Sequence, residues 1–215
     1  ERDPALPLSV YMHALGGTGI TAYGGLLETG KLKDGEQVFV STAGGAVGSV
    51  VAQIAKIKGC YVVGSTGADD KAQWLRDEAG LDAVINYKTQ DLAKALEAAT
   101  PMGIDVYFEN VGGAHLDAAL PRMNVHGRIP VCGMISTYNG GGEGVGGLFN
   151  MIYKRIRMEG FVATDFAHLN AQFVSDMTGW LKNGQIKYQE TILDGFERAP
   201  EGLIGLFEGR NSGKM

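Results

Sequence analysis

QVFVSTAGGAVGSVVAQIAKIK, residues 37–58, opens with a short apolar run, Val38 to Val40, of the length of a buried strand. Small residues from Ser41 to Gly45 follow, where the backbone has to turn sharply. Apolar residues then recur at helical spacing, at Val47, Val50, Val51, Ile54 and Ala55. A strand, a turn of small residues and a helix in this order indicate the start of a βαβ unit of the type that binds dinucleotides.

The turn, Ala43-x-Gly45-x-x-Gly48, is a variant of the G-x-G-x-x-G pattern with alanine at the first position. Gly45 lets the main chain approach a pyrophosphate, and Gly48 lets the helix lie close to the strand. The start of the helix offers free N–H groups and the positive end of its dipole to phosphate oxygens. We therefore expect a diphosphate at Gly45, Ala46, Val47 and Gly48. The alternative is a glycine-rich turn that binds nothing.

Composition excludes several classes of partner. The chain has 215 residues, 45% of them apolar, and a net charge of −5 from 19 basic and 24 acidic residues without a basic run. This argues against nucleic acid or a membrane as a partner. Cys60 and Cys132 lack C-x-x-C spacing, which favours a reducing, cytoplasmic location. The four histidines are scattered without ligand spacing, so we expect no metal.

Outside the first unit, strand-like and helix-like segments alternate. The expected strands are residues 61–64, 83–85, 104–108, 127–131, 157–162 and 190–193. The expected helices are residues 18–29, 69–78, 92–99, 114–120, 148–155, 169–182 and 200–207. Because parallel strands need a covered crossover, the alternation predicts an α/β fold: a Rossmann-type, doubly wound parallel sheet with helices on both faces. Pro130 argues against an interior position for its strand.

Ligands of such sheets bind at the carboxyl ends of the strands. The second strand ends in Gly64-Ser65-Thr66-Gly67, without the acidic residue that holds the adenosine ribose of NAD. The hydroxyls of Ser65 and Thr66, followed by Lys71, favour a 2′-phosphate and therefore NADP(H). Asp69 or Asp70 is expected to cap the helix. The glycine-rich stretch 139–147 is expected to be an exposed loop, the alternative being a second phosphate cradle.

Six segments resemble the zinc-independent medium-chain dehydrogenase/reductases, in the branch of the prostaglandin, alkenal and curcumin reductases. They are AGGAVGSVVAQIAKIKGCYVVG from Ala43, INYKT from Ile85, ENVGG from Glu109, CGMISTYN from Cys132, IRMEGF from Ile156 and FEGRNSGK from Phe207. The resemblance implies a catalytic domain before this region and a final strand after it. We therefore expect residues 1–17 to be a linker from that domain, 18–186 an NADP-binding domain, and 187–215 a segment that returns toward the catalytic domain.

The resemblance also implies contacts with the cofactor. Lys71 and Tyr87 would hold the 2′-phosphate; the alternatives are a solvated lysine and a packing tyrosine. Asn110 and Val111 would lie beside the nicotinamide half, although Asn110 could instead only form a turn. The other residues implied are Cys132, Gly133, Ile135, Ser136 and Tyr138 on the same half, the backbone of Phe161, Val162 and Ala163 at the carboxamide, and Asn211 closing over the cofactor.

Members of this branch reduce the C=C bond of α,β-unsaturated carbonyl compounds, so the resemblance implies a small enone substrate. Charge that develops on the enolate oxygen needs a hydrogen-bond donor, and Tyr138 is the best candidate, unless it only packs on the cofactor. The alternatives are a quinone reductase of the same superfamily and a noncatalytic NADP-binding module. The resemblance also implies a homodimer formed through the edge of the sheet.

Overall fold

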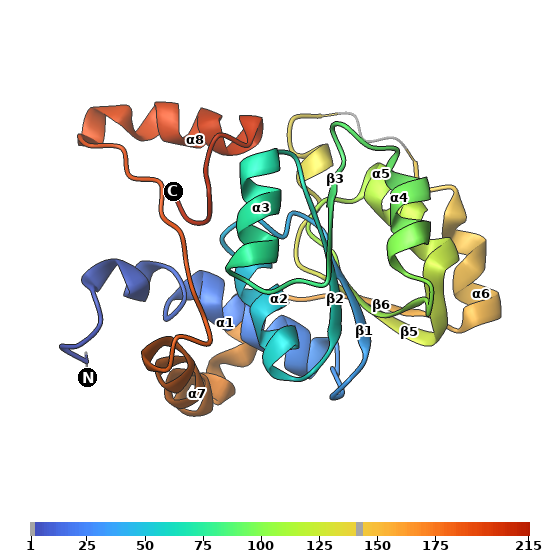
Figure 1. Ribbon diagram of the computed structural model, residues 1–215, viewed down its shortest axis with the longest axis horizontal. Coiled ribbons are helices and arrows are strands. Elements are labelled where there is room, and N and C mark those ends of the chain that lie inside the picture. Colours follow the sequence, from blue (N-terminus) through green and yellow to red (C-terminus); the bar gives the residue numbers. More distant parts are fainter. Residues whose placement is uncertain (1–2, 141–143) are drawn as a thin grey trace.

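The computed structural model describes residues 3–140 and 144–215, and its centre is a six-stranded parallel sheet in the order β3-β2-β1-β4-β5-β6 (Figure 1). The strands are β1 (Gln37–Val40), β2 (Tyr61–Thr66), β3 (Ala83–Asn86), β4 (Ile104–Phe108), β5 (Met123–Val131) and β6 (Arg157–Gly160). The strand order reverses between β1 and β4, which is the switch point of a doubly wound sheet. The predicted fold class is therefore confirmed.

Helices cover both faces of the sheet (Figure 1). One layer holds α1 (Gly17–Gly24), α2 (Gly48–Ile57), α3 (Asp69–Asp77) and α7 (Asn170–Lys182). The other holds α4 (Leu92–Ala99), α5 (Gly113–Ala119) and α6 (Asn150–Lys154). Alternation along β1 serves both layers, because Val38 and Val40 join the first core and Phe39 joins the second.

The sequence analysis took Pro130 as an argument against an interior position for its strand, and this expectation is wrong. β5 lies between β4 and β6, where Pro130 pairs with Glu159. Its carbonyl accepts a hydrogen bond from the N–H of Glu109 at 3.0 Å. Proline lacks the backbone donor but keeps the acceptor, and here the acceptor is sufficient to hold the strand in the ladder.

Segments near both ends of the chain contact the glycine-rich turn, through His13 and Gly213. Residues 6–15, where the sequence predicts a linker, contribute Leu6 and Val10 to the core, and the ring of His13 contacts Ala46. The predicted strand 190–193 is reduced to a single bridge between Glu190 and Lys214. After α8 (Ala199–Glu208), the chain returns to this turn, where the N–H of Gly213 donates to the Gly44 carbonyl at 3.1 Å.

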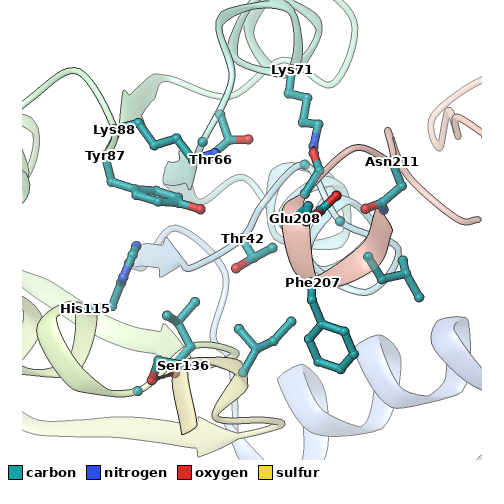
Figure 2. A pocket seen from close by; sticks show the side chains of 18 of the residues that line it. Thr42, Thr66, Lys71, Tyr87, Lys88, His115, Ser136, Phe207, Glu208 and Asn211 are labelled. Carbon is teal, nitrogen blue, oxygen red and sulfur yellow. Dashed lines mark hydrogen bonds between the residues drawn. The ribbon is translucent and has the colours of Figure 1, made fainter. Parts of the chain in front are cut away.

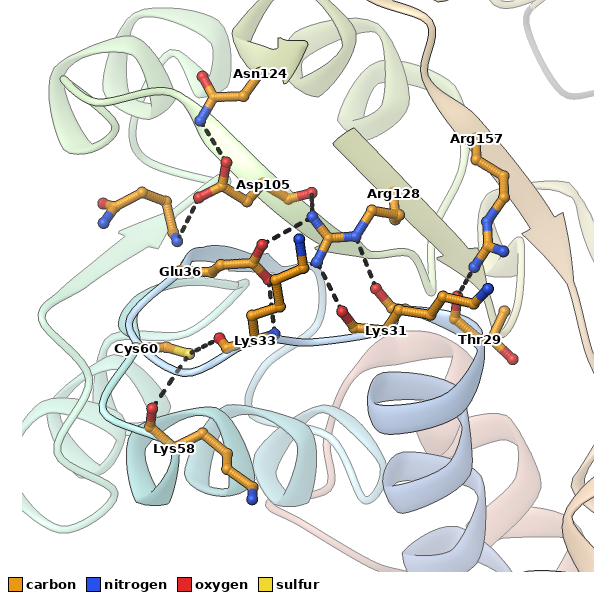
Figure 3. A network of polar contacts seen from close by, with 12 residues as sticks. Thr29, Lys31, Lys33, Glu36, Lys58, Cys60, Asp105, Asn124, Arg128 and Arg157 are labelled. Atoms are coloured by element: carbon orange, nitrogen blue, oxygen red, sulfur yellow. Dashed lines mark hydrogen bonds and ion pairs between the residues drawn. The ribbon is translucent and has the colours of Figure 1, made fainter. Parts of the chain in front are cut away.

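The opposite end of the sheet is held together by a network of polar contacts (Figure 3). Arg128 of β5 forms a two-pronged ion pair with Glu36, in which the two side chains are 14% and 15% exposed. The same guanidinium donates to the carbonyl of Gly30 at 2.9 Å. Asp105 of β4 accepts from Gln37 and Asn124. These contacts fix the amino ends of β1, β4 and β5 and leave the carboxyl ends free for a site.

No helix among the described residues is long and apolar enough to cross a membrane. The prediction for residues 139–147 falls partly outside the description, since 141–143 are not covered.

Candidate functional site

Two adjoining cavities lie at the carboxyl ends of the strands. The larger, of about 500 Å³, extends over the ends of β2 and β3, and α8 closes one side of it (Figure 2). The smaller, of about 340 Å³, extends from the glycine-rich turn to the ends of β4 and β5. Both are lined by Thr42, Gly45, Ile135, Leu206 and Asn211. The two cavities are therefore parts of one cleft across the switch point, where an elongated ligand of two halves would lie.

The glycine-rich turn forms the middle of this cleft. A Cβ at Gly48 would lie 2.3 Å from the Thr42 carbonyl oxygen, so only glycine allows α2 to start this close to the turn. Within the described residues, the N–H groups of Val47 and Gly48 donate to no recorded hydrogen bond. His13 supports the turn from the side away from the cleft, since its Nε2 lies 3.1 Å from the Ala46 carbonyl oxygen. Burial lowers the pKa of this imidazole. The turn thus presents free donors at a helix N-terminus.

The ends of β2 and β3 bring together Thr66, Lys71, Tyr87 and a further lysine, Lys88 (Figure 2). Lys71 Nζ donates to the carbonyl of Gly209 at 2.6 Å. Burial lowers the pKa of Lys71, and the nearby Asp70 acts in the opposite direction. Two cations and a phenol therefore face the cavity, and the end of β2 beside them carries no carboxylate.

The expected acidic cap of the helix after β2 is not formed. Ala68 is the N-cap, and Asp69 instead accepts a hydrogen bond from the side chain of Asn86 at 2.6 Å. The reason is the neighbouring end of β3, where the side-chain amide of the buried Asn86 lies within reach of the carboxylate. Asp69 is thereby held away from the cavity lining.

Tyr87 is held by a neighbour that the sequence analysis did not single out. Its ring meets that of His115 edge to face, with the centroids 5.0 Å apart. His115 Nε2 lies 3.1 Å from Ser65 Oγ, and burial lowers the pKa of this imidazole to about 4. A Cβ at Gly67 would lie 2.7 Å from the Tyr87 hydroxyl, so glycine keeps that position open. The Tyr87 hydroxyl points into the cavity (Figure 2).

The smaller cavity collects most of the other predicted residues. Its lining includes Ala46, Val47, Gly48, Asn110, Cys132, Gly133 and Tyr138. Tyr138 is 59% exposed, and its hydroxyl accepts from the N–H of Met134 at 3.4 Å. Burial raises the pKa of the Cys132 thiol to about 11, which keeps it protonated at neutral pH. Val111 and Ser136 line the larger cavity instead.

Four predicted residues lie off both cavity linings: Ser65, Phe161, Val162 and Ala163. Ser65 is buried and its hydroxyl is directed to His115. Phe161 packs on Phe108 and Phe166, with centroid distances of 6.0 and 5.4 Å. Val162 is exposed. Ser65 lies within β2, and β6 ends at Gly160, before Phe161. The sequence pattern locates these residues at the carboxyl ends of strands but does not indicate on which side of the strand each side chain lies.

Sequence reasoning missed several lining residues, namely Thr42, Lys88, His115, Leu206, Phe207 and Glu208. Lys88 follows Tyr87 directly at the tip of β3, so its position was available as a signal. Thr42 lies in the turn with a left-handed φ of 52°. The α8 residues gave no signal, since nothing in their own pattern places that helix over the cleft.

The fold and the cleft are those of a Rossmann-type domain, with the strand order 3-2-1-4-5-6 and a glycine-rich turn at the switch point. Residues 46–178 match the family model of the zinc-binding dehydrogenases, and the chain belongs to this family. Within the family, it resembles the zinc-independent branch of the prostaglandin, alkenal and curcumin reductases. Among the described residues, no group of three or more His, Cys, Asp or Glu could hold a metal ion.

Individual relatives agree with this assignment. An NADP(+)-dependent 2-alkenal reductase from Nicotiana tabacum is 51% identical over 99% of this chain and 63% of its own length. An NADPH-dependent curcumin reductase from Escherichia coli is 43% identical over 100% of this chain and 63% of its own. The crystal structure of CurA from Vibrio vulnificus in complex with NADPH superimposes with a TM-score of 0.92 at 43% identity, over 100% of this chain and 65% of that one. The chain thus spans less than two thirds of the length of these relatives.

Proposed function

We propose that this chain is the NADP(H)-binding part of an NADPH-dependent reductase of α,β-unsaturated carbonyl compounds. The observation that supports this best is the set of Lys71, Lys88 and Tyr87 around the tip of β2. Two cations and a hydroxyl suit a 2′-phosphate, and the absence of a carboxylate at the strand tip removes the usual partner of the NAD ribose.

The residues of the cleft fit such a cofactor along its length. The N–H groups of Val47 and Gly48, which donate to no other described residue, suit the diphosphate. The larger cavity, with Tyr87, suits the adenosine end, and the smaller one, with Asn110 and Tyr138, suits the nicotinamide end. Asn211 lines both cavities and would close over the middle. The backbone of Phe161, Val162 and Ala163 stays a proposed contact with the carboxamide.

The cofactor supplies a hydride for the β-carbon of the substrate. The task of the protein is then to stabilise the charge on the enolate oxygen, and we assign it to the hydroxyl of Tyr138, which is exposed within the smaller cavity. The named activities of the relatives support an enone rather than a quinone as substrate, because the 2-alkenal and curcumin reductases are 51% and 43% identical to this chain.

Parallel calorimetric titrations with NADPH and NADH test the cofactor assignment. We expect NADPH to bind at least tenfold more tightly, since one charge-assisted hydrogen bond contributes about 1.5–3 kcal/mol. Equal affinity for both would contradict it. Single-turnover oxidation of NADPH by an α,β-unsaturated ketone tests the chemistry. Tyr138→Phe should lower its rate by about 10²-fold. An unchanged rate would remove Tyr138 from its role.

We also propose that the protein forms a homodimer through the β6 edge of the sheet. Among the described residues, no strand pairs with the outer side of β6. α6 packs on the neighbouring strand β5, and apolar side chains of η5 (Gly147–Phe149) and α6 are exposed at Phe149, Ile152 and Tyr153. Exposed strand edges and clustered apolar side chains are typical of protein interfaces.

A further inference from the structure

A buried carboxylate, Glu109, lies at the switch point directly behind the smaller cavity. It follows β4 and is 0% exposed. Its Oε1 accepts from the N–H of Val111 at 2.6 Å and from the hydroxyl of Ser41 at 3.0 Å. Among the described residues its Oε2 has no hydrogen-bond partner. A buried, partly unpaired carboxylate costs free energy, so its presence calls for an explanation.

The side chain of Glu109 connects the end of β4 to the end of β1 through Ser41. The Ser41 hydroxyl, which donates to Glu109, accepts from the N–H of Asn110 at 2.8 Å. The Asn110 side-chain amide in turn donates to the Ser41 carbonyl at 2.7 Å. The Ser41 hydroxyl therefore fixes the backbone of Asn110, and the Ser41 carbonyl fixes its side chain. Glu109 Oε1 is the nearer acceptor of that hydroxyl, at 3.0 Å against 3.3 Å for the Phe108 carbonyl.

The backbone of residues 109–111 holds the loop after β5. The Glu109 carbonyl accepts from Cys132 at 2.8 Å and from Gly133 at 3.2 Å. The carbonyls of Asn110 and Val111 accept from Ile135 and Ser136, each at 3.1 Å. The loop that carries Tyr138 therefore depends on the conformation of residues 109–111. A change at Glu109 would reach the nicotinamide end of the cleft through Asn110 and Tyr138. Among the described residues, Lys71, Tyr87 and Lys88 at the ends of β2 and β3 share no hydrogen bond with residues 109–111.

Tyr107 completes the environment of this carboxylate. Its ring stacks on Phe39 with the centroids 4.8 Å apart, and within the described residues its buried hydroxyl has no hydrogen-bond partner. Burial, and then the charge of Glu109, hold the pKa of Tyr107 well above its ordinary value. The phenol thus stays neutral beside the carboxylate, and no described cation forms an ion pair with Glu109.

We infer that Glu109 is a positioning residue for the nicotinamide half of the cofactor, acting through Ser41 and Val111 on Asn110 and the loop that carries Tyr138. This inference rests on the proposed function, since it assumes that NADPH occupies the cleft. We therefore expect the acceptor at Oε1 to matter for the nicotinamide half and the 2′-phosphate contacts of Lys71, Tyr87 and Lys88 not to depend on it.

Calorimetric titration of the 215-residue chain with NADPH and with adenosine 2′,5′-bisphosphate tests the inference. The second probe contains only the adenosine half with its 2′-phosphate. Glu109→Ala and Ser41→Ala should weaken NADPH about tenfold, the loss expected for a hydrogen bond to a charged group, and change the bisphosphate less than twofold. Glu109→Gln keeps an oxygen acceptor in place and should bind NADPH within about threefold of the wild type. Lys71→Ala is the matched control, because it should weaken both ligands alike.

Three results would overturn the inference. Equal weakening of both ligands by Ser41→Ala would mean a general loss of structure. Because Ser41→Ala removes only a hydroxyl, it also serves as the test variant if Glu109→Ala does not fold. A loss in Glu109→Gln as large as in Glu109→Ala would assign the effect to charge. Full NADPH affinity in Ser41→Ala would show that the network positions nothing. A wild-type chain that binds neither ligand would instead reject the proposed function and, with it, this inference.

Discussion

Lys71 and Gly209, 138 residues apart in sequence, are joined by a hydrogen bond of 2.6 Å from the ammonium to the carbonyl oxygen. The bond ties α3 to the residue that ends α8, where Gly209 takes a left-handed φ of 70°. The carboxyl end of a helix carries partial negative charge and attracts a cation. Since an ammonium has three donors, Lys71 can hold α8 and still donate to a phosphate in the cavity.

The first prediction follows from this placement of Lys71. Lys71→Ala should weaken NADPH by about ten- to a hundredfold, the value of one charge-assisted hydrogen bond, and NADH by much less. Parallel calorimetric titrations measure both. Lys94→Ala is the matched control, since that side chain is 85% exposed on α4, away from the cleft. Equal weakening of NADPH and NADH by Lys71→Ala would reject the 2′-phosphate assignment.

The second prediction concerns the pH dependence of stability. Burial lowers the pKa of His115 from 6.5 to about 4, so the unfolded chain binds this proton more readily than the folded one. The stabilisation is therefore complete above about pH 6.5 and is lost as the pH falls toward 4, with a total of about 3 kcal/mol.

Urea unfolding of the wild type and of His115→Gln at pH 7 and pH 4.5 measures this. The variant should lose less stability than the wild type on acidification. Burial also lowers the pKa of His13. The stability of the wild type and of His115→Gln should therefore both keep a residual dependence on pH. A His115→Gln variant with the full wild-type slope would contradict the prediction.

The third prediction concerns the closeness of α2 to the turn. Gly48→Ala places a Cβ 2.3 Å from the Thr42 carbonyl oxygen and should lower the free energy of unfolding by about 1–3 kcal/mol. Gly179→Ala in α7 is the control, since a Cβ there meets nothing within 4 Å, and it should raise the stability by about 0.5–1 kcal/mol. Urea unfolding compares the two. A Gly48→Ala variant as stable as the wild type would show that the turn adapts.

The sequence predicted those features that depend on local pattern. The glycine-rich turn and the alternation of strands and helices led to the correct sheet, because periodicity and turn chemistry act over a few residues. Lys71 and Tyr87 reach one cavity because both follow adjacent strand ends. The sequence could not indicate that His115 holds Tyr87, since their contact joins segments 28 residues apart. Nor could it place α8 over the cleft or direct Ser65 away from it.

The last prediction concerns assembly through β6, whose sequence Arg157-Met158-Glu159 is self-complementary. In an antiparallel pair of β6 strands centred on Met158, each Arg157 lies opposite Glu159 of the second copy, and such opposite-charge pairs stabilise a sheet. α6 packs on β5, the strand next to β6. Its residue Ile152 is 69% exposed. A chain of 22.8 kDa should therefore show twice that mass in light scattering coupled to size exclusion.

Ile152→Glu should shift the equilibrium to the monomer, because it places a charge at an apolar contact. Leu203→Glu on α8, a site 58% exposed and remote from β6, should leave the dimer intact. A monomeric wild type would exclude this interface. Dissociation by Leu203→Glu and not by Ile152→Glu would show that the dimer forms through α8 instead.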